Sequence, residues 1–193
     1  YIAQGIPIKV RQPMVFIKPL SAYITQGTPI KIPLGCKKLN HEVEVGVIIG
    51  KPGFQITESN AMKHIGGYTV SLDMTAADML AEARQKGLPW TIGKGFDTAC
   101  PVGDFIPKDR IENIKDLGLW LKINGEMKQD GNTKDMVFDV PKLISFMSQY
   151  ITLEEGDLIL TGSPAGVGPV KPGDIITCGM HVPGVAEVTF KVE

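Results

Sequence analysis

Three carboxylates are the residues of this chain whose types and spacing best predict chemistry. Glu42 and Glu44 stand two positions apart, and Asp73 lies further along, within the apolar residues 69–74. Side chains two positions apart project from the same face of an extended strand, and a neighbouring strand can bring the third beside them. Such carboxylates repel one another strongly unless a cation lies between them. We therefore predict a site for a hard divalent ion, Mg²⁺ or Mn²⁺, with water or substrate at its remaining positions.

The acidic pair has a second interpretation. Glu42 and Glu44 would then lie on the solvated face of a half-buried strand, because alternating strands carry charged side chains outward. His41 adjoins the pair but alternates to the opposite face, so we interpret it as a supporting or structural group rather than a metal ligand. The spacing alone leaves both interpretations of the pair open.

Lys94 is the second candidate for chemistry, because it lies between Gly93 and Gly95. Glycine lets the backbone approach a ligand closely, and a lysine beside a metal site can hold a substrate carboxylate or stabilise an oxyanion. The alternative is an ordinary surface lysine in a turn.

A glycine-rich loop over residues 161–168 follows an apolar run. Thr161 offers a hydroxyl, and Gly162 offers a backbone N–H, to an anionic ligand. The loop lacks the lysine of a nucleotide-binding P-loop, so nucleotide phosphate is a poor candidate ligand. A plain turn is the alternative.

The elements that must position these groups are mainly strands. The chain contains 22 glycines and 14 prolines, and they separate many short apolar runs, a pattern typical of a β-rich domain. We predict strands over residues 14–17, 43–49, 68–72, 119–123, 157–161, 175–178 and 186–192. Asn124 and Gly125 predict a tight hairpin turn within residues 122–128.

Helices are fewer in the predicted structure. Residues 75–86 form the clearest one, with Thr75 as its cap, Asp78 in its first turn and Gly87 after its end. Pro141 introduces a second helix over residues 142–149, and residues 58–64 form a short third one. We predict one mixed β-rich α+β domain over residues 1–193 with peripheral helices.

Composition limits the partners and the compartment. A net charge of −1 over 193 residues gives no reason to expect a nucleic-acid partner. No apolar run nears the roughly 20 residues that cross a membrane, so we expect no membrane partner either. Cys36, Cys100 and Cys178 are widely spaced, which favours a reducing, intracellular compartment over a disulfide or zinc framework. The chain begins with Tyr1, so we expect its N-terminal part to be incomplete.

Taken in chain order, several segments resemble the fumarylacetoacetate hydrolase superfamily. Within it, the chain is most similar to the small single-domain branch of acylpyruvate hydrolases and oxaloacetate decarboxylases. The segments span nearly the whole chain and comprise residues 16–19, 40–47, 66–68, 72–76, 86–90, 93–97, 151–157 and 161–164.

This resemblance implies a β-roll of the family's C-terminal-domain type, usually as a homodimer in the cytoplasm or the mitochondrial matrix. It assigns metal binding to Glu42, Glu44 and Asp73. It also implies that Lys94 is a catalytic residue facing the substrate, a small 2-oxo acid. Thr161 and Gly162 would contact that substrate.

The chain departs from the family pattern at three positions. Relatives carry a His–Glu pair in an N-terminal lid, and here Gln4 stands at the histidine position. Either the pair is lost or lid residues are absent from this sequence, and we favour the second. Relatives also carry Arg and Gln on the helix after the metal-binding aspartate, where this chain has Ala77 and Leu80. We expect these apolar side chains to favour acylpyruvates with apolar tails.

The expected activity is Mg²⁺-dependent hydrolysis of a C–C bond in acylpyruvates through the enolate of pyruvate. Oxaloacetate decarboxylation and keto–enol isomerisation at the same site are alternatives, and decarboxylation needs no water nucleophile. A hypothesis of another class is a metal-binding module without turnover. The presence of Lys94 and the three carboxylates argues against the module, while Gln4, Ala77 and Leu80 argue for it.

Overall fold

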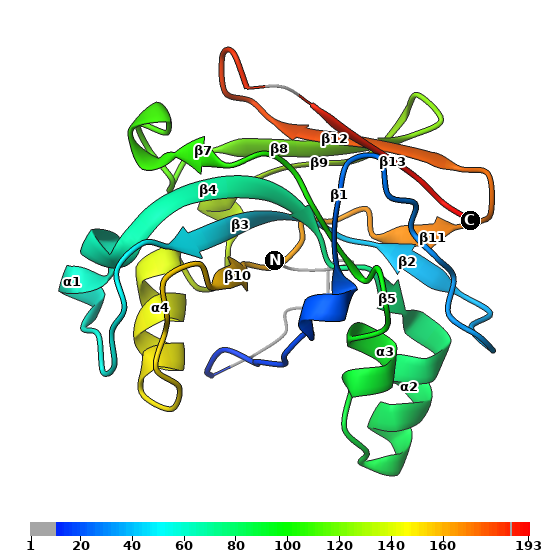
Figure 1. The fold of residues 1–193 in the computed structure, drawn as a ribbon, viewed down its shortest axis with the longest axis horizontal. Helices are drawn as coiled ribbons and strands as arrows, with labels where there is room; N and C mark the ends of the chain where they lie inside the picture. Colours follow the sequence, from blue (N-terminus) through cyan, green and yellow to red (C-terminus); the bar gives the residue numbers. More distant parts are fainter. Residues whose placement is uncertain (1–10, 186) are drawn as a thin grey trace.

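The computed structural model describes residues 11–185 and 187–193. Curled sheets form the body of the protein, and short helices lie at its periphery (Figure 1). The predicted β-rich α+β fold is therefore confirmed. In the described part of the chain, no helix has both the length and the apolar character that a membrane span requires.

The largest sheet carries the acidic residues. Its strands run in the order β1–β6–β4–β3–β10, and β7 pairs with β4 at the side. They comprise β1 (Tyr23–Thr25), β3 (Val43–Ile49), β4 (Ile65–Leu72), β6 (Cys100–Val102), β7 (Ile106–Pro107) and β10 (Leu158–Leu160). The central pair β3 and β4 is antiparallel, with Val43 opposite Leu72 and Glu44 opposite Ser71.

Two smaller sheets complete the structure. The four-stranded sheet has the order β13–β12–β8–β9, and the three-stranded sheet has the order β11–β2–β5. Their strands are β2 (Leu39–His41), β5 (Thr75–Ala76), β8 (Gly118–Ile123), β9 (Glu126–Asn132), β11 (Gly168–Val170), β12 (Ile175–Met180) and β13 (Val188–Lys191). The β8–β9 turn has Asn124 and Gly125 at φ 51° and 85°, which confirms the predicted hairpin.

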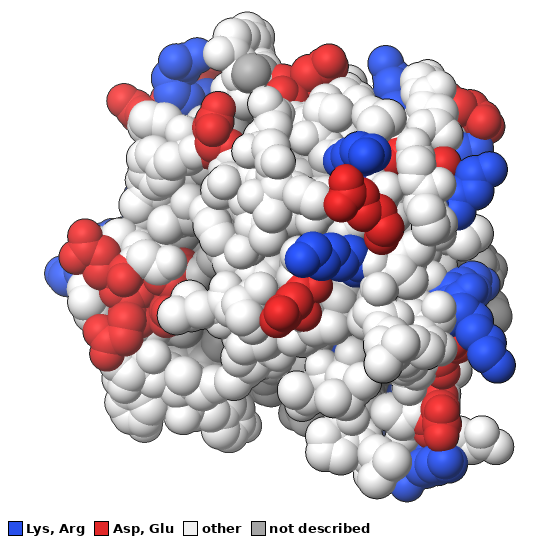
Figure 2. Space-filling model, turned by 45° about the vertical axis from the view of Figure 1, so that its right-hand side comes forward, with Lys and Arg blue, Asp and Glu red and all other residues white. Residues whose placement is uncertain are grey.

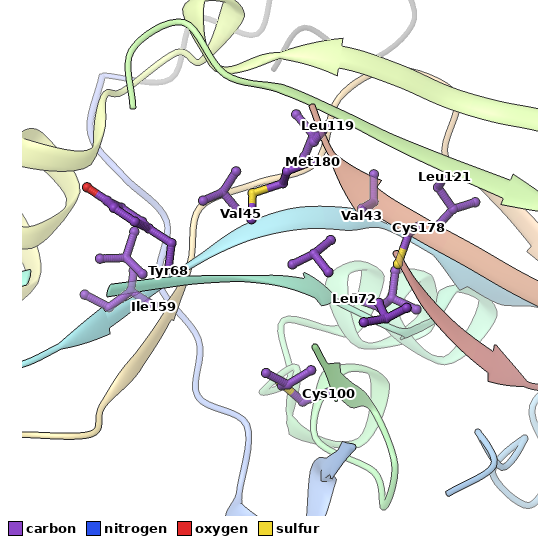
Figure 3. Close-up of a cluster of buried hydrophobic side chains, with 14 of the residues drawn as sticks. Val43, Val45, Tyr68, Leu72, Cys100, Leu119, Leu121, Ile159, Cys178 and Met180 are labelled. Atoms are coloured by element: carbon purple, nitrogen blue, oxygen red, sulfur yellow. The ribbon is translucent and has the colours of Figure 1, made fainter. Parts of the chain in front are cut away.

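The core lies between the largest sheet and the four-stranded sheet. Val43 and Val45 of β3 point toward Leu119 and Leu121 of β8 and toward β12 (Figure 3). Side chains alternate between the two faces of a strand, so the intervening residue Glu44 points to the other face. The core packing of β3 and β4 therefore holds a polar face in place on the opposite side.

Four α-helices and several 3-10 turns surround the sheets in the described residues. They are η2 (Leu20–Ala22), α1 (Glu58–Ala61), η3 (Met62–His64), α2 (Ala77–Lys86), α3 (Thr91–Lys94), η4 (Lys108–Arg110), η5 (Thr133–Asp135) and α4 (Val140–Ser148). Gly87 ends α2 in the left-handed conformation at φ 63°, and the Asp139 side chain caps α4. The three predicted helical regions are confirmed, with shifted boundaries.

Two local predictions were wrong. Residues 14–17 form no strand, because an apolar run becomes a strand only where it pairs with a neighbouring strand. Thr75 does not cap α2, because it lies in β5 and its hydroxyl donates to the Asp73 carbonyl oxygen at 3.1 Å. Residue 186, the first of the predicted final strand, lies outside the described residues.

Charged side chains are mixed on the face drawn in Figure 2. Lys and Arg side chains lie beside Asp and Glu side chains there, and wide uncharged areas separate these groups. This face presents no basic patch of the kind that nucleic-acid binding requires.

Candidate metal centre and active site

The pairing of β3 with β4 brings the three carboxylates together. Glu42 directly precedes β3 and Asp73 directly follows β4, and the Asp73 N–H donates to the Glu42 carbonyl oxygen at 2.9 Å. Glu44 lies two positions beyond Glu42, on the same face. Carboxylate oxygens of all three residues lie within 4.8 Å of one another.

These carboxylates lie in a buried environment. Glu44 and Asp73 are 4% and 2% exposed, so the solvated-face interpretation is wrong for Glu44. Burial and the charges of Asp73 and Glu42 raise the pKa of Glu44 to about 8. Burial and the Asp73 charge also raise the pKa of Glu42. The cluster therefore needs compensating positive charge to remain ionised.

Lys94 supplies part of that charge. Its Nζ lies 2.5 Å from Asp73 Oδ2, 3.2 Å from Glu42 Oε2 and 2.6 Å from Thr75 Oγ1. The residue is 5% exposed, so the surface-turn interpretation is wrong. Burial by itself would lower the pKa of Lys94, but the charges of Asp73 and Glu42 outweigh it and raise the pKa. Lys94 is therefore an ammonium group at neutral pH.

The glycines that flank Lys94 serve chain packing. A Cβ at Gly93 would lie 3.0 Å from Leu80 Cβ, and one at Gly95 would lie 2.9 Å from Pro19 Cδ. Both glycines therefore allow α3 to approach α2 and the N-terminal segment closely, and their approach to a ligand stays a prediction.

Lys18 is a second cation that the sequence analysis missed. Its Nζ lies 2.7 Å from Asp73 Oδ1, and it also donates to the carbonyl oxygens of Met74 and Lys94. The ring of Phe16, from the same segment, lies 4.8 Å from Lys94 Nζ. The sequence feature that could have indicated Lys18 was its position within residues 16–19, one of the segments that resemble the family. The strand predicted over residues 14–17 ends directly before Lys18, and nothing in that pattern indicated a contact with Asp73.

The loop at Thr161 is tied to β3. The Gly162 N–H donates to Glu44 Oε2 at 2.6 Å, and the Thr161 hydroxyl donates to the Val45 carbonyl oxygen at 2.9 Å. The loop therefore lies beside the carboxylates. Its predicted contacts with substrate stay a prediction, since both donors are engaged with β3.

His41 points away from the carboxylates, as its alternation predicted, and is 1% exposed. Its Nδ1 lies 2.8 Å from Gln129 Oε1, which also accepts from the Val43 N–H at 3.1 Å. A backbone N–H can only donate, so the group facing Val43 is the amide oxygen, and His41 carries its proton on Nδ1. Burial lowers the pKa of His41. Gln129 was missed, because nothing in its local sequence predicts this contact.

The donor set fits a hard divalent cation. Asp73 Oδ1 is buried and receives no hydrogen bond from the described residues, although the Lys18 ammonium is close. Three ionised carboxylates and two ammonium groups would give the cluster a net charge of −1, and burial opposes that ionisation by raising the pKa of Glu44. A divalent cation would make it positive and suited to an anionic substrate. Oxygen-only donors are those that Mg²⁺ and Mn²⁺ prefer.

Two features expected from the sequence, the lid at Gln4 and the side chain of Leu80, are not seen as part of the carboxylate cluster. The lid position, Gln4, lies outside the described residues. Leu80 is 6% exposed and its Cβ lies against Gly93, immediately before Lys94. That side chain therefore contributes to the contact between α2 and α3.

The fold and this cluster define a class of domain in which a curled sheet holds an acidic candidate metal site beside a buried lysine. Residues 3–193 match the family described as Fumarylacetoacetate (FAA) hydrolase C-terminal. The chain belongs to this family, which confirms the resemblance seen in the sequence.

Named relatives are similar over most of their length. The chain is 53% identical over 170 residues to the mitochondrial oxaloacetate decarboxylase of Dictyostelium discoideum, covering 88% of this chain and 78% of that one. It is 50% identical over 182 residues to the mitochondrial oxaloacetate tautomerase FAHD1 of Homo sapiens, covering 94% of this chain and 81% of that one.

Solved structures share the fold. The fumarylpyruvate hydrolase of Pseudomonas aeruginosa, in complex with Mn²⁺ and pyruvate, superposes with a TM-score of 0.87 at 32% identity. The match covers 94% of this chain and 79% of that chain. The 2-hydroxyhepta-2,4-diene-1,7-dioate isomerase of Mycobacterium marinum has a TM-score of 0.85 at 36% identity, covering 94% of this chain and 69% of that one. The expected family fold is thereby confirmed.

Proposed function

We propose that this chain is a divalent-metal-dependent enzyme that acts on oxaloacetate and catalyses its keto–enol tautomerisation and its decarboxylation. The observation that carries the proposal is the Lys94 ammonium, held between Asp73 and Glu42. Both reactions develop negative charge on the 2-oxygen of the substrate, and a fixed ammonium group stabilises such charge. The names of the relatives move oxaloacetate ahead of the acylpyruvates that the sequence favoured.

Glu42, Glu44 and Asp73 would hold Mg²⁺ or Mn²⁺. When bound, the ion supplies Lewis-acid polarisation of a 2-oxo acid. The convergence of the three carboxylates, whose ligand oxygens lie within 4.8 Å of one another, supports this assignment. The Mn²⁺ and pyruvate named for the Pseudomonas aeruginosa relative support it as well.

The residues of the chain have distinct roles in this proposal. Tautomerisation moves a proton between C3 and the 2-oxygen of oxaloacetate. Decarboxylation breaks the C3–C4 bond, whose electron pair forms the enolate of pyruvate as CO₂ leaves, and a proton then adds at C3. Lys94 stabilises the oxyanion in both cases, and Lys18 orients Asp73 from its other side. Thr161 and Gly162 form the loop edge that receives a substrate carboxylate.

Acylpyruvate hydrolysis is the second candidate function. The apolar Ala77 and Leu80 favour it, and so does the name of the fumarylpyruvate hydrolase relative. Hydrolysis also needs an activated water, a role that the family resemblance assigns to the lid pair. A metal-binding module without turnover is a weaker hypothesis, because a buried lysine among carboxylates is costly to keep without a catalytic use.

Mitochondrial location and dimer formation belong to the same proposal. The oxaloacetate-acting relatives are named as mitochondrial proteins, so we place this chain in the mitochondrial matrix rather than the cytoplasm. We also propose a homodimer, in keeping with the family resemblance.

The test compares three activities side by side. Purified protein is assayed with Mg²⁺, with Mn²⁺ and after chelation, for oxaloacetate tautomerisation, oxaloacetate decarboxylation and acetylpyruvate hydrolysis. We expect metal-dependent turnover of oxaloacetate with the highest kcat/KM. A clear preference for acetylpyruvate would favour acylpyruvate hydrolysis over the proposed function. If no substrate is turned over with either metal, the metal-binding module without turnover is the remaining hypothesis.

A further inference from the structure

The side-chain amide of Gln129 is a fully bonded group at the edge of the active site. The residue lies in β9 and is 1% exposed. Its Oε1 accepts from His41 Nδ1 at 2.8 Å and from the Val43 N–H at 3.1 Å. Its Nε2 donates to Ser163 Oγ at 2.7 Å and to the Pro164 carbonyl oxygen at 2.9 Å. Every hydrogen-bonding position of the amide is therefore used.

These bonds join two segments that carry active-site residues. His41 and Val43 flank Glu42 in the chain, on the β2–β3 side of the cluster. Ser163 and Pro164 directly follow Gly162, whose N–H donates to Glu44 Oε2. Gln129 itself belongs to the four-stranded sheet. One side chain from another sheet thus connects the strand that carries the acidic pair with the loop of residues 161–164.

The two backbone partners give the amide a single orientation. The Val43 N–H can only donate and the Pro164 carbonyl can only accept, so a flipped amide would lose both bonds. Such a buried, satisfied polar group specifies one arrangement of the segments around it. Gln129 therefore helps to fix the position of the loop relative to Glu42 and Glu44, together with the direct bonds from Thr161 and Gly162 to β3.

Close packing supports the same contact. A Cβ at Gly131 would lie 2.4 Å from Pro164 Cβ, and a Cβ at Gly166 would lie 2.0 Å from the Lys128 carbonyl oxygen. Glycine at these positions lets β9 and the loop approach closely on both sides of Gln129. The loop is thus held against β9 by backbone proximity as well as by hydrogen bonds.

From these contacts we propose that Gln129 is a positioning residue for substrate binding. It holds the loop of residues 161–164 against the carboxylate cluster, so that the loop receives the carboxylate of the 2-oxo acid at a fixed distance from Lys94. The role deepens the function proposed above and rests on it. Gln129 acts through Ser163 and Pro164, without touching the substrate.

This role predicts a particular kinetic signature. A loosened loop weakens binding of the ground state and of the transition state alike, so KM rises while kcat is kept. Simple loss of folded protein has the opposite effect, because it lowers the apparent kcat and leaves KM unchanged. The split between KM and kcat therefore separates positioning from a merely structural contribution.

Gln129→Glu is the main test variant. One oxygen of the new carboxylate can still accept hydrogen bonds from the Val43 N–H and from His41. The other oxygen cannot donate to the Pro164 carbonyl oxygen, and the two oxygens repel each other. Ser163→Ala removes only one of the bonds to the loop, without placing a charge in the interior. Gln149→Glu makes the same chemical change as the main variant at an exposed position after α4 and serves as the matched control.

Three measurements are made on each variant. They are kcat and KM for oxaloacetate decarboxylation with Mg²⁺, thermal unfolding, and hydrogen exchange of a peptide covering residues 160–168 in metal-free protein. For Gln129→Glu we expect KM to rise about tenfold or more, as is typical when a supporting group is lost, with kcat within about threefold. Loop amides should exchange about tenfold faster, while those of β12 stay unchanged. Ser163→Ala should show a smaller rise in KM and a smaller increase in loop exchange, and Gln149→Glu should match the parent.

Opposite outcomes overturn the inference. A fall in kcat with KM unchanged in both variants would reduce Gln129 to a structural role. Unchanged exchange in the loop would show that Gln129 does not hold it. Failure of the parent protein to turn over oxaloacetate would instead remove the proposed function, and the exchange experiment on metal-free protein would still support or overturn the link between Gln129 and the loop.

Discussion

Lys94 Nζ lies 2.5 Å from Asp73 Oδ2, and both side chains are almost completely buried. The aspartate follows β4 and the lysine ends α3, so the pair joins the sheet that carries the acidic cluster to the helical side of the protein. A buried ion pair of this kind is costly to break, because either partner alone leaves an uncompensated charge in the interior. Substitution of a member of this pair therefore tests the proposed catalytic centre directly.

Replacement of Lys94 by Met should lower kcat/KM for oxaloacetate by about a hundredfold or more, the cost typical of losing one oxyanion donor. Mg²⁺ binding should persist, because the carboxylates remain. Mg²⁺ should also raise the unfolding temperature more than in the parent, since the ion then replaces the lost positive charge.

The control for this variant is Lys86→Met. Lys86 pairs with Glu82 on the exposed surface of α2 and is 57% exposed. Steady-state kinetics and thermal unfolding with and without Mg²⁺ check the prediction. Kinetics of Lys94→Met within about twofold of the parent would contradict a catalytic role for Lys94.

Replacement of Glu42 by Ala should abolish metal-dependent turnover while the protein remains folded. Removal of one carboxylate relieves repulsion in the cluster, so the metal-free protein should unfold at a temperature no lower than the parent. We expect Mn²⁺ affinity, measured by calorimetry, to fall at least about tenfold, the effect seen even for groups that only support a ligand. Glu155→Ala, at an exposed position, is the control. Full Mn²⁺ affinity in Glu42→Ala would refute the ligand assignment.

Asp78 should contribute an acid-sensitive part of the stability. Burial pushes its pKa upward, but hydrogen bonds from the Lys37 and Lys38 N–H groups and the Cys36 thiol outweigh this and lower the pKa. Because the folded pKa is lower than the unfolded one, the stabilisation is present above the unfolded value of 3.8 and is lost as pH falls through the folded pKa.

The test variant is Asp78→Asn. It should lower the free energy of unfolding by about 1 kcal/mol at neutral pH, a value reduced for solvent exposure. It should also flatten the loss of stability below about pH 4. Chemical denaturation across pH 3 to 7 measures both, with the exposed Asp104→Asn as the control. Identical pH profiles for parent and Asp78→Asn would contradict the assignment.

The protein should form a homodimer in solution. Several large apolar side chains are exposed among the described residues, including Leu20 at 93%, Leu34 at 99% and Ile92 at 70%. The family resemblance is the ground for this expectation, and side chains of this kind would be covered if they lie in the subunit interface. Light scattering at micromolar concentration should give twice the monomer mass. The monomer mass at that concentration would contradict the prediction.

The sequence by itself determined features that depend on local backbone geometry. Glu42 and Glu44 share a face because strand side chains alternate. Asn124 with Gly125 adopts the predicted hairpin turn, and Gly87 ends α2, because these residues tolerate positive φ. The family resemblance also indicated Asp73 and Lys94 before any contact was known.

Only the tertiary structure decided which distant groups meet at the site. The register of β3 against β4 places Asp73 beside Glu42, and no spacing in the sequence specifies that register. Lys18 reaches Asp73 from a segment whose apolar pattern predicted a strand. Gln129 connects His41 with Ser163 from a different sheet. These contacts depend on packing between elements far apart in the chain, and local propensity carries no information about such packing.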